Sequence, residues 1–438
     1  MRLLVTRATF SKLRIALTGN SASARMGRGA FWLSSGNIVG QVIGVISGII
    51  AARILGSENY GTLNLLRSSI DTATLFAGLA LGVTANRYVA LYRTANPTEA
   101  GRIIGMTTML AWCTSLVAAA FVLVGAEKFS QLLHAPTLVN EIRISGGLVL
   151  LSTVASAYGG ILTGLESFKK QAFISLTVSL IQAPLIVWGI LTAGVMGGLL
   201  AMTASSALSI ALTIRATKVG MKQFAIISTF SMDTEQRRIL KEFTLPALMS
   251  AAMVIPVFWA GSVFLSATSD GYHQLGLFAA ANQWRQAILL LPNILSSVSL
   301  PILTNLLGNR NEKEYASMLR KNVLVVAFVT IMPATILAIL SPWIMKVYGS
   351  DFHDGWVVMI LLLVAAILSA LSNVFGQTIA SSGRMWIGLT LNSLWATSFI
   401  LMAWMLCPIH GAVGLASAYA ASYAVHALAS TIVVRRLR

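Results

Sequence analysis

The sequence predicts an all-α polytopic membrane protein with about 12 transmembrane helices in two pseudo-symmetric six-helix bundles. Three observations predict this fold: long apolar runs, basic residues confined to alternate gaps between the runs, and an internal repeat. Hydrophobic residues make up 56% of the 438 residues and charged residues only 10%, whereas an ordinary soluble domain has roughly 25% charged residues. Apolar stretches such as 103–125 do not alternate with polar residues as barrel strands would, so we expect helices.

The apolar runs divide the chain into two halves of six helices each. We expect helices at residues 31–53, 62–86, 103–125, 144–165, 171–193, 195–215, 243–266, 274–305, 322–345, 356–379, 384–407 and 411–434. The domains then read as a basic cytoplasmic tail (1–29), an N-lobe with helices one to six (30–215), a cytoplasmic connector (216–242) and a C-lobe with helices seven to twelve (243–438). Pro246 and Pro256 in the seventh helix, and Pro292 in the eighth, are expected to permit bending.

Basic residues set the orientation. If the N-terminus is cytoplasmic, 25 of the 31 lysines and arginines fall in inside segments, four fall in outside segments, and two lie within helices. This bias follows the positive-inside rule and places both termini in the cytoplasm. The formal net charge of +17 is therefore read as membrane orientation, and no nucleic-acid partner is expected. The basic tail is interpreted as contacting the inner leaflet rather than as a transit peptide.

Glycine-containing segments repeat at half the chain length. Three glycine pairs are separated by nearly the same offset, close to half of the sequence: Gly61 with Gly276, Gly160 with Gly376, and Gly198 with Gly414. Because six helices per half is an even number, both halves start on the same side of the membrane. The repeat is therefore expected to be parallel, with its axis along the membrane normal.

No catalytic constellation is found, so the chain is predicted to be a transporter rather than an enzyme. It has no P-loop, no metal-ligand spacing and only two distant cysteines, and we expect no cofactor and no metal. The informative residues are the ionisable ones at membrane depth, which are costly there and usually face a cavity: Arg67, Asp71 and Arg285.

Arg67 and Asp71 are four residues apart and share a helix face. They form either a self-neutralised pair or a functional site in which Arg67 contacts an anion and Asp71 responds to a coupling ion. At the offset that relates Gly61 to Gly276, Arg285 aligns with Ile70, so both arginines are expected in one central cavity. The alternative for Arg285 is a snorkelling or backbone-bonded arginine. Polar residues on matching faces are expected to line the same cavity: Asn37, Gln41, Asn282 and Gln286.

Guanidinium groups suit a phosphate-bearing cargo. Four segments, 51–61, 160–168, 278–285 and 347–352, resemble motifs of the O-antigen and polysaccharide flippase type within the multidrug/oligosaccharidyl-lipid/polysaccharide exporter superfamily. The resemblance implies two six-helix bundles around a V-shaped cationic cavity, with Arg67 and Arg285 as candidate cationic residues. It implies that an undecaprenyl-diphosphate-linked oligosaccharide crosses the bacterial cytoplasmic (inner) membrane by ion-coupled alternating access. The expected context is synthesis of O-antigen, lipopolysaccharide or exopolysaccharide, with a polysaccharide polymerase and chain-length machinery as partners beside the lipid bilayer.

Three other functions compete with the flippase interpretation. A cation-coupled multidrug exporter of the same superfamily usually carries acidic residues in its first or seventh helix; none occurs here, and both arginines would repel a cationic drug. Peptidoglycan-precursor flippases usually have two extra helices. A membrane-embedded polymerase or ligase would be expected to have a large outside loop, whereas the longest outside gap is about 126–143.

Overall fold

A computed structural model describes residues 22–308, 312–381 and 385–436. Within these ranges every regular element is helical. The α-helices are α2 (Ala22–Gly78), α3 (Leu81–Tyr92), α4 (Pro97–Leu132), α5 (Val139–Gly164), α6 (Phe168–Gln223), α7 (Thr234–Ile239), α8 (Leu245–Ala252), α9 (Ile255–Ser266), α10 (Gly271–Gly308), α11 (Glu312–Tyr348), α12 (Trp356–Ser381) and α13 (Met385–Arg436). Three short elements join them: η1 (Pro136–Leu138), η2 (Leu240–Thr244), a single π-helical turn, and η3 (Ser350–Gly355).

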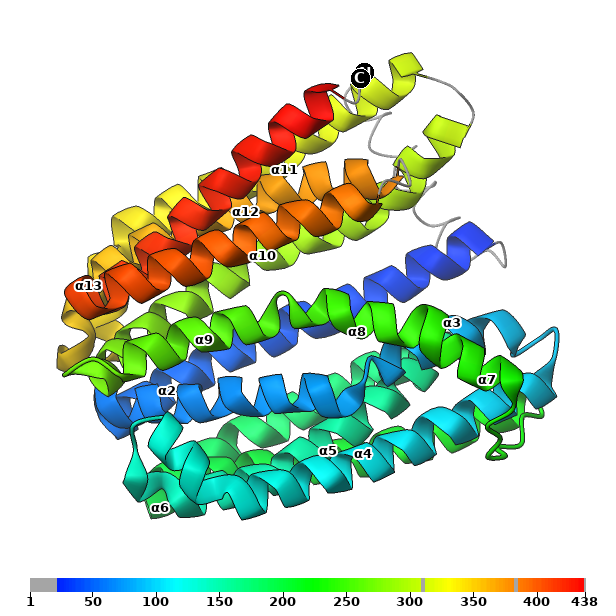
Figure 1. Cartoon of the computed structure of the whole chain (residues 1–438), viewed down its shortest axis with the longest axis horizontal. Helices are drawn as coiled ribbons and strands as arrows, with labels where there is room; N and C mark the ends of the chain where they lie inside the picture. Colours follow the sequence, from blue (N-terminus) through cyan, green and yellow to red (C-terminus); the bar gives the residue numbers. More distant parts are fainter. Residues whose placement is uncertain (1–21, 309–311, 382–384, 437–438) are drawn as a thin grey trace, which may run out of the picture.

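The fold is a polytopic all-α bundle, as predicted. Eight helices in the described part of the chain are long and apolar enough to cross a membrane. Three long helices contain internal kinks, at Gly56 in α2, at Ala193 and Gly194 in α6, and at Gly411 in α13. At these kinks α2 and α13 fold back, and each forms two arms that run along the bundle (Figure 1). The total of twelve crossings and the cytoplasmic location of both termini stay predictions.

The kinks repeat between the two halves. Gly194 has φ 56° and ψ −135°, and Gly411, at the corresponding place in the second half, has φ 54° and ψ −131°. Glycine adopts this region readily because it lacks a Cβ. Three residues after each kink, a glycine packs against the carbonyl eight residues before it: Gly197 on Gly189, and Gly414 on Leu406. The pseudo-symmetry of the two halves is therefore visible in backbone conformation.

This repeat corrects the predicted partner of Gly414. The sequence pairs Gly414 with Gly198, but the structurally equivalent position is Gly197, one residue earlier. A Cβ on Gly198 would instead meet the side chains of Ile190 and Leu63, because that position faces a different neighbour. Glycine identity alone could not distinguish two adjacent glycines.

We expect Gly411→Ala to lower the melting temperature of the protein. An L-residue at φ 54° and ψ −131° is strained, at a cost of about 1–3 kcal/mol. Thermal unfolding in detergent measures the effect. Gly388→Ala in the same helix is the matched control, because a Cβ there meets nothing within 4 Å. An equal melting temperature for both variants would contradict the expectation.

Two predicted helices differ from the structure. The predicted helix 62–86 is interrupted, because Leu79 and Ala80 both take positive φ values (45° and 55°) between α2 and α3. The predicted helix 243–266 is divided into η2, α8 and α9, with Pro246 and Pro256 at the starts of α8 and α9. Proline is tolerated there because the first N–H groups of a helix have no intrahelical acceptor. By contrast, α10 continues through Pro292.

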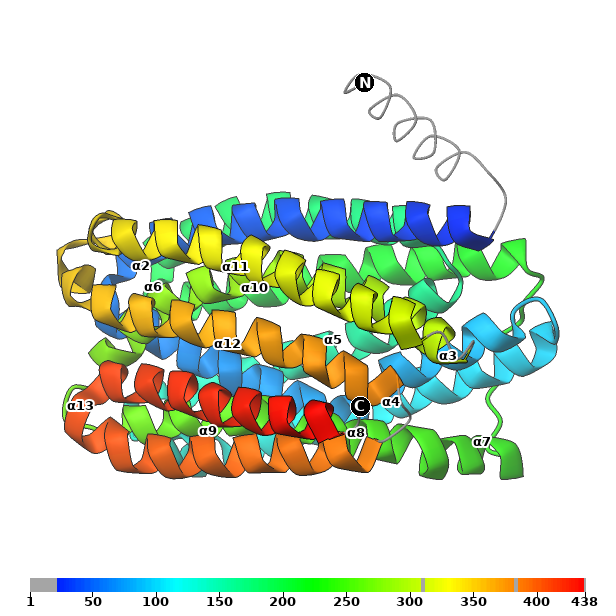
Figure 2. The same ribbon diagram turned by 90° about the horizontal axis from the view of Figure 1, so that it is seen from above.

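The helices pack as two groups. In one group α2 packs on α6 and α5 on α4 and α6; in the other α12 packs on α10, α11 and α13, and α9 on α13. The groups meet mainly where α2 lies against α10 and α9, and they form two layers in Figure 1, with a view from above in Figure 2.

The domain boundaries at 215 and 243 stay predictions. The predicted tail 1–29 falls mostly outside the described residues, and its last part, from Ala22, belongs to α2.

Candidate functional site

At one end of the bundle, α2 and α10 cross in close contact through two glycines. A Cβ on Gly61 would overlap the carbonyl oxygen of Tyr272, and a Cβ on Gly276 would overlap the carbonyl oxygen of Ser57. Ser57 and Tyr272 are themselves related by the same sequence offset as the two glycines, so the contact is reciprocal and pseudo-symmetric. Small residues allow membrane helices to approach to this distance. The two glycines that the sequence paired, Gly61 and Gly276, thus lie at the same helix crossing in the structure.

Hydrogen bonds reinforce this crossing. Ser57 Oγ lies 2.5 Å from His273 Nδ1, joining α2 to α10. Arg53 Nε donates to the carbonyl oxygen of Val347 at 2.6 Å, joining α2 to the end of α11. The two halves are therefore held together at this end, which the predicted orientation places on the outer side.

A polar cavity of about 460 Å³ begins beside the crossing and continues along the same two helices. Its wall is formed by α2, α6, α9 and α10, so both halves contribute to it. The polar lining residues are Gln41, Ser47, Tyr60, Asn64, Arg67, Ser68, Asp71, Ser179, Gln182, Ser262, Asn282, Gln283 and Gln286.

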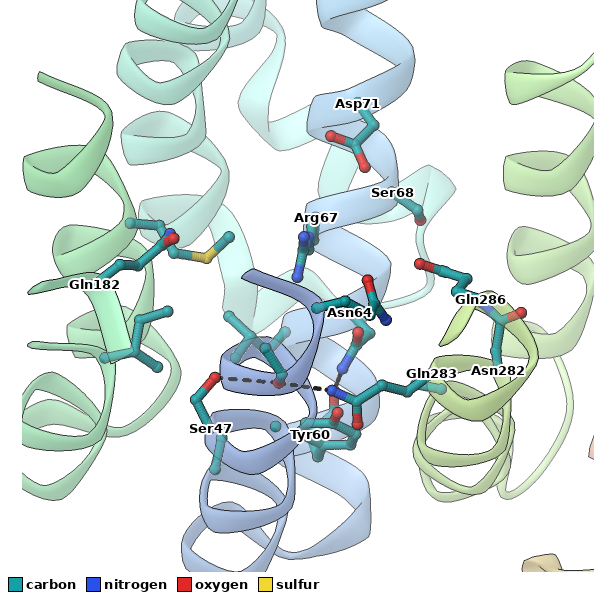
Figure 3. Close-up of a pocket in the computed structure, with 18 of the residues that line it drawn as sticks. Ser47, Tyr60, Asn64, Arg67, Ser68, Asp71, Gln182, Asn282, Gln283 and Gln286 are labelled. Atoms are coloured by element: carbon teal, nitrogen blue, oxygen red, sulfur yellow. Dashed lines mark hydrogen bonds between the residues drawn. The ribbon is translucent and has the colours of Figure 1, made fainter. Parts of the chain in front are cut away.

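Arg67 and Asp71 are the charged side chains of this lining (Figure 3). Both come from the second arm of α2, one turn apart, and both are exposed. Neither forms a hydrogen bond or an ion pair within 4.0 Å with any residue that the structure describes. The guanidinium and carboxylate groups are therefore free to contact a ligand, and together they give the cavity no formal net charge.

The lining amides differ in which of their atoms remain available. Asn64 uses its amide N–H to bond the carbonyl of Tyr60 at 2.9 Å, so its oxygen is left for the cavity. Gln283 donates to the carbonyl of Gly44 in α2 at 2.8 Å and accepts from the hydroxyl of Tyr348 in α11 at 2.8 Å, so both ends of its amide are engaged by neighbouring helices. Asn282 has the opposite arrangement to Asn64, because the amide oxygen of Asn282 accepts a hydrogen bond from Arg285 and its NH₂ group is left for the cavity.

The predicted site residues divide between the cavity and its surroundings. Arg67, Asp71, Gln41, Asn282 and Gln286 all line the cavity. Asn37 lies one turn before Gln41 and is exposed, but it is outside the lining.

Arg285 is not in the lining. It is 8% exposed and lies inside the C-terminal group of helices, with its guanidinium carbon 5.2 Å from the ring centroid of Tyr419 and 5.8 Å from that of Phe258. Its Nε donates to Asn282 Oδ1 at 2.6 Å. The two arginines therefore do not share one cavity as expected. Arg67 lines the cavity, and Arg285 is buried behind the cavity wall.

Two lining glutamines were missed by the sequence analysis. Gln182 lies in α6, two residues before Pro184, and Gln283 follows Asn282 in α10. An uncharged amide inside an apolar run is costly in lipid and usually finds a polar partner or a cavity. Applying that rule to every such amide, rather than to the stripes around ionisable residues, would have identified both.

Comparison with known proteins decides the family. The family described as "Polysaccharide biosynthesis protein" matches residues 26–307. The chain belongs to this family. A curated relative, the EPS I polysaccharide export inner membrane protein EpsE of Ralstonia nicotianae, is 26% identical over 203 residues, 46% of each protein, so that match spans about half of EpsE. The lipid III flippase of Escherichia coli is 25% identical over 418 residues, 92% of this chain and 96% of that protein.

The fold of this polysaccharide biosynthesis family member is also found among solved transporters. An inward-facing multidrug resistance MATE family transporter of the MOP superfamily superposes with a TM-score of 0.78 at 14% identity, covering 91% of this chain and 95% of that one. At that identity the likeness shows the fold alone. The apolar helices and the inner-membrane relatives make the family member a multi-pass inner membrane protein.

Proposed function

We propose that this family member is a flippase that moves a lipid-diphosphate-linked oligosaccharide across the inner membrane for surface polysaccharide synthesis, by alternating access of its two halves. The cavity carries the proposal. It lies between the halves, it is closed at one end by the Gly61–Gly276 crossing, and it offers a free guanidinium beside many amide and hydroxyl groups. These groups match the two parts of such a cargo, because guanidinium binds phosphate and amides bind sugar hydroxyls.

The relatives support the same cargo class. The lipid III flippase, which aligns over almost the whole chain, is named for a lipid substrate, and EpsE is named for polysaccharide export. A polysaccharide polymerase and chain-length machinery are the partners that this role would require.

The test is direct. Deletion of the gene should cause the lipid-linked oligosaccharide to accumulate on the cytoplasmic face, and purified protein in proteoliposomes should move that isolated lipid to the opposite leaflet. An unrelated membrane protein in matched vesicles gives the background rate. A reconstituted rate equal to that background would contradict the proposal.

The second candidate is a cation-coupled multidrug exporter, which the MATE fold and the free carboxylate of Asp71 favour. A drug exporter would bind a lipophilic cation near Asp71, whereas a flippase would bind an anionic headgroup near Arg67. Competition between tetraphenylphosphonium and undecaprenyl diphosphate for the purified protein separates the two. Tighter binding of the cation would favour the exporter.

For Asp71 we expect a role in ion coupling. Asp71→Asn keeps the size of the side chain and removes the charge that a coupling cation or proton would neutralise. Flipping by the variant is expected to lose its dependence on an imposed proton or sodium gradient, measured in proteoliposomes with each gradient in turn. Asn64→Asp, which adds a carboxylate two turns away, is the companion variant. If Asp71→Asn keeps the wild-type gradient dependence, Asp71 is structural.

A further inference from the structure

Arg285 is a buried positive charge that has no carboxylate partner among the residues the structure describes. It forms no ion pair with a described residue, and its guanidinium lies against the faces of Tyr419 and Phe258. Arginine stays charged in proteins, so the charge persists inside the helix group. Aromatic faces stabilise a cation by about 0.5–2 kcal/mol, and Arg285 Nε also donates a 2.6 Å hydrogen bond to Asn282.

That hydrogen bond fixes the orientation of Asn282. The Nε–H of arginine can only donate, so the amide of Asn282 must turn its oxygen toward Arg285. Its NH₂ group then has no protein partner in the part of the chain that the structure describes, and Asn282 lines the cavity. Asn64 has the reverse orientation, and both ends of Gln283 are engaged.

The charge of Arg285 also strengthens Asn282 as a donor. An amide whose oxygen accepts from a cation is polarised, and its N–H groups donate more strongly, an effect that a low-dielectric surrounding enhances. Arg285 can therefore act on the cavity through Asn282 without entering it. Asn282 projects from α10, while Arg67 projects from α2 (Figure 3).

We propose that Arg285 is a positioning residue that aims the Asn282 amide N–H groups at the diphosphate of the cargo, so that Asn282 provides a second phosphate contact from the C-terminal half alongside Arg67 from the N-terminal half. This inference rests on the proposed function. In this arrangement each half of the transporter contributes one contact to the same diphosphate group.

The test measures binding of radiolabelled undecaprenyl diphosphate, with undecaprenol as the uncharged reference, to the full chain in detergent. Asn282→Ala and Arg285→Met should each weaken diphosphate binding about tenfold, the equivalent of one hydrogen bond of about 1.4 kcal/mol. The double variant should lose no more than either single variant, because both remove the same contact. Methionine fits among aromatic rings, and melting temperatures monitor folding.

Asn282→Asp is the decisive second variant. Its carboxylate would pair with Arg285 and hold the local fold, but it would present an oxygen to the cargo instead of an NH₂ group. Diphosphate binding should fall further than in Asn282→Ala without a lower melting temperature. Asn373→Ala, an asparagine of α12 that bonds Asn293 outside the cavity lining, is the matched control.

The outcomes separate the two proposals. If the wild-type protein does not prefer undecaprenyl diphosphate to undecaprenol, the proposed function fails and this inference fails with it. If that preference is present but Arg285→Met binds like the wild type, or if the losses of the two single variants multiply in the double variant, only the inference is overturned. Both proposals are supported if the wild type prefers undecaprenyl diphosphate to undecaprenol, the two single variants lose equal affinity, and the double variant loses no more than either.

Discussion

Gly61→Val is expected to abolish transport by keeping α2 and α10 apart at the end of the bundle that the predicted orientation places outside. A Cβ at Gly61 already overlaps the backbone carbonyl of Tyr272, which cannot move without moving α10. Overpacking of this kind costs about 1–3 kcal/mol, and about 1.4 kcal/mol changes a two-state population tenfold. The variant should therefore favour the conformation in which this end is open. Gly276→Val, its pseudo-symmetric counterpart, should have the same effect.

The measurement is labelling from outside the cell of a cysteine introduced at Asn64, a cavity position beyond the crossing, in a background with Cys113 replaced. Gly61→Val should raise the labelling rate about tenfold or more, together with loss of flipping in proteoliposomes. Gly147→Val in α5 is the control, because a Cβ there meets nothing within 4 Å. Unchanged labelling in Gly61→Val would show that the crossing does not control access to the cavity.

Arg67→Ala should remove most of the affinity for a phosphate-bearing cargo. The guanidinium is exposed in the cavity and unpaired among the described residues, so its hydrogen bonds are available to a ligand. A hydrogen bond to a charged group contributes about 1.5–3 kcal/mol, which predicts a loss of roughly tenfold to a hundredfold in binding. The folded state should be little affected, since the guanidinium forms no hydrogen bond or ion pair with a described residue.

Binding of undecaprenyl diphosphate and flipping of the native lipid-linked oligosaccharide measure this effect. Arg67→Lys keeps the charge but lacks paired donors, so it should recover part of the binding. Unaltered binding by Arg67→Ala, at an unaltered melting temperature, would exclude Arg67 as the phosphate contact.

Much of the architecture could be predicted because membrane burial imposes strict rules on sequence. Apolar length defines the helices: the turn at Gly194 falls in the one-residue gap between predicted helices 171–193 and 195–215, and the turn at Gly411 falls on the first residue of the predicted helix 411–434. Arg67 and Asp71 were recognisable because charge at membrane depth needs a polar surrounding. The break at Leu79 and Ala80 was not recognisable, since neither residue type favours a positive φ.

The environment of Arg285 could not be predicted from the rule that a charge at membrane depth needs a polar surrounding. Arg285 lies just under one helical turn after Asn282 and directly before Gln286, so it stands at the margin of the polar stripe that contains both. Periodicity cannot tell which side of that margin faces the cavity. The contact with Tyr419 is what holds Arg285 away from the cavity. Tyr419 lies in α13, far along the chain, and only tertiary packing brings it to α10.

The one guanidinium and one carboxylate of the cavity bear on how the membrane voltage acts. Without cargo or a coupling ion, these two charges cancel, so the voltage exerts no net force on the pair. A bound diphosphate adds negative charge, and each elementary charge moved through about 100 mV is worth about 2.3 kcal/mol. In the proposed flippase, with the cell interior negative, this charge would favour the loaded step toward the outside, whereas a return step without cargo or coupling ion would carry no voltage penalty.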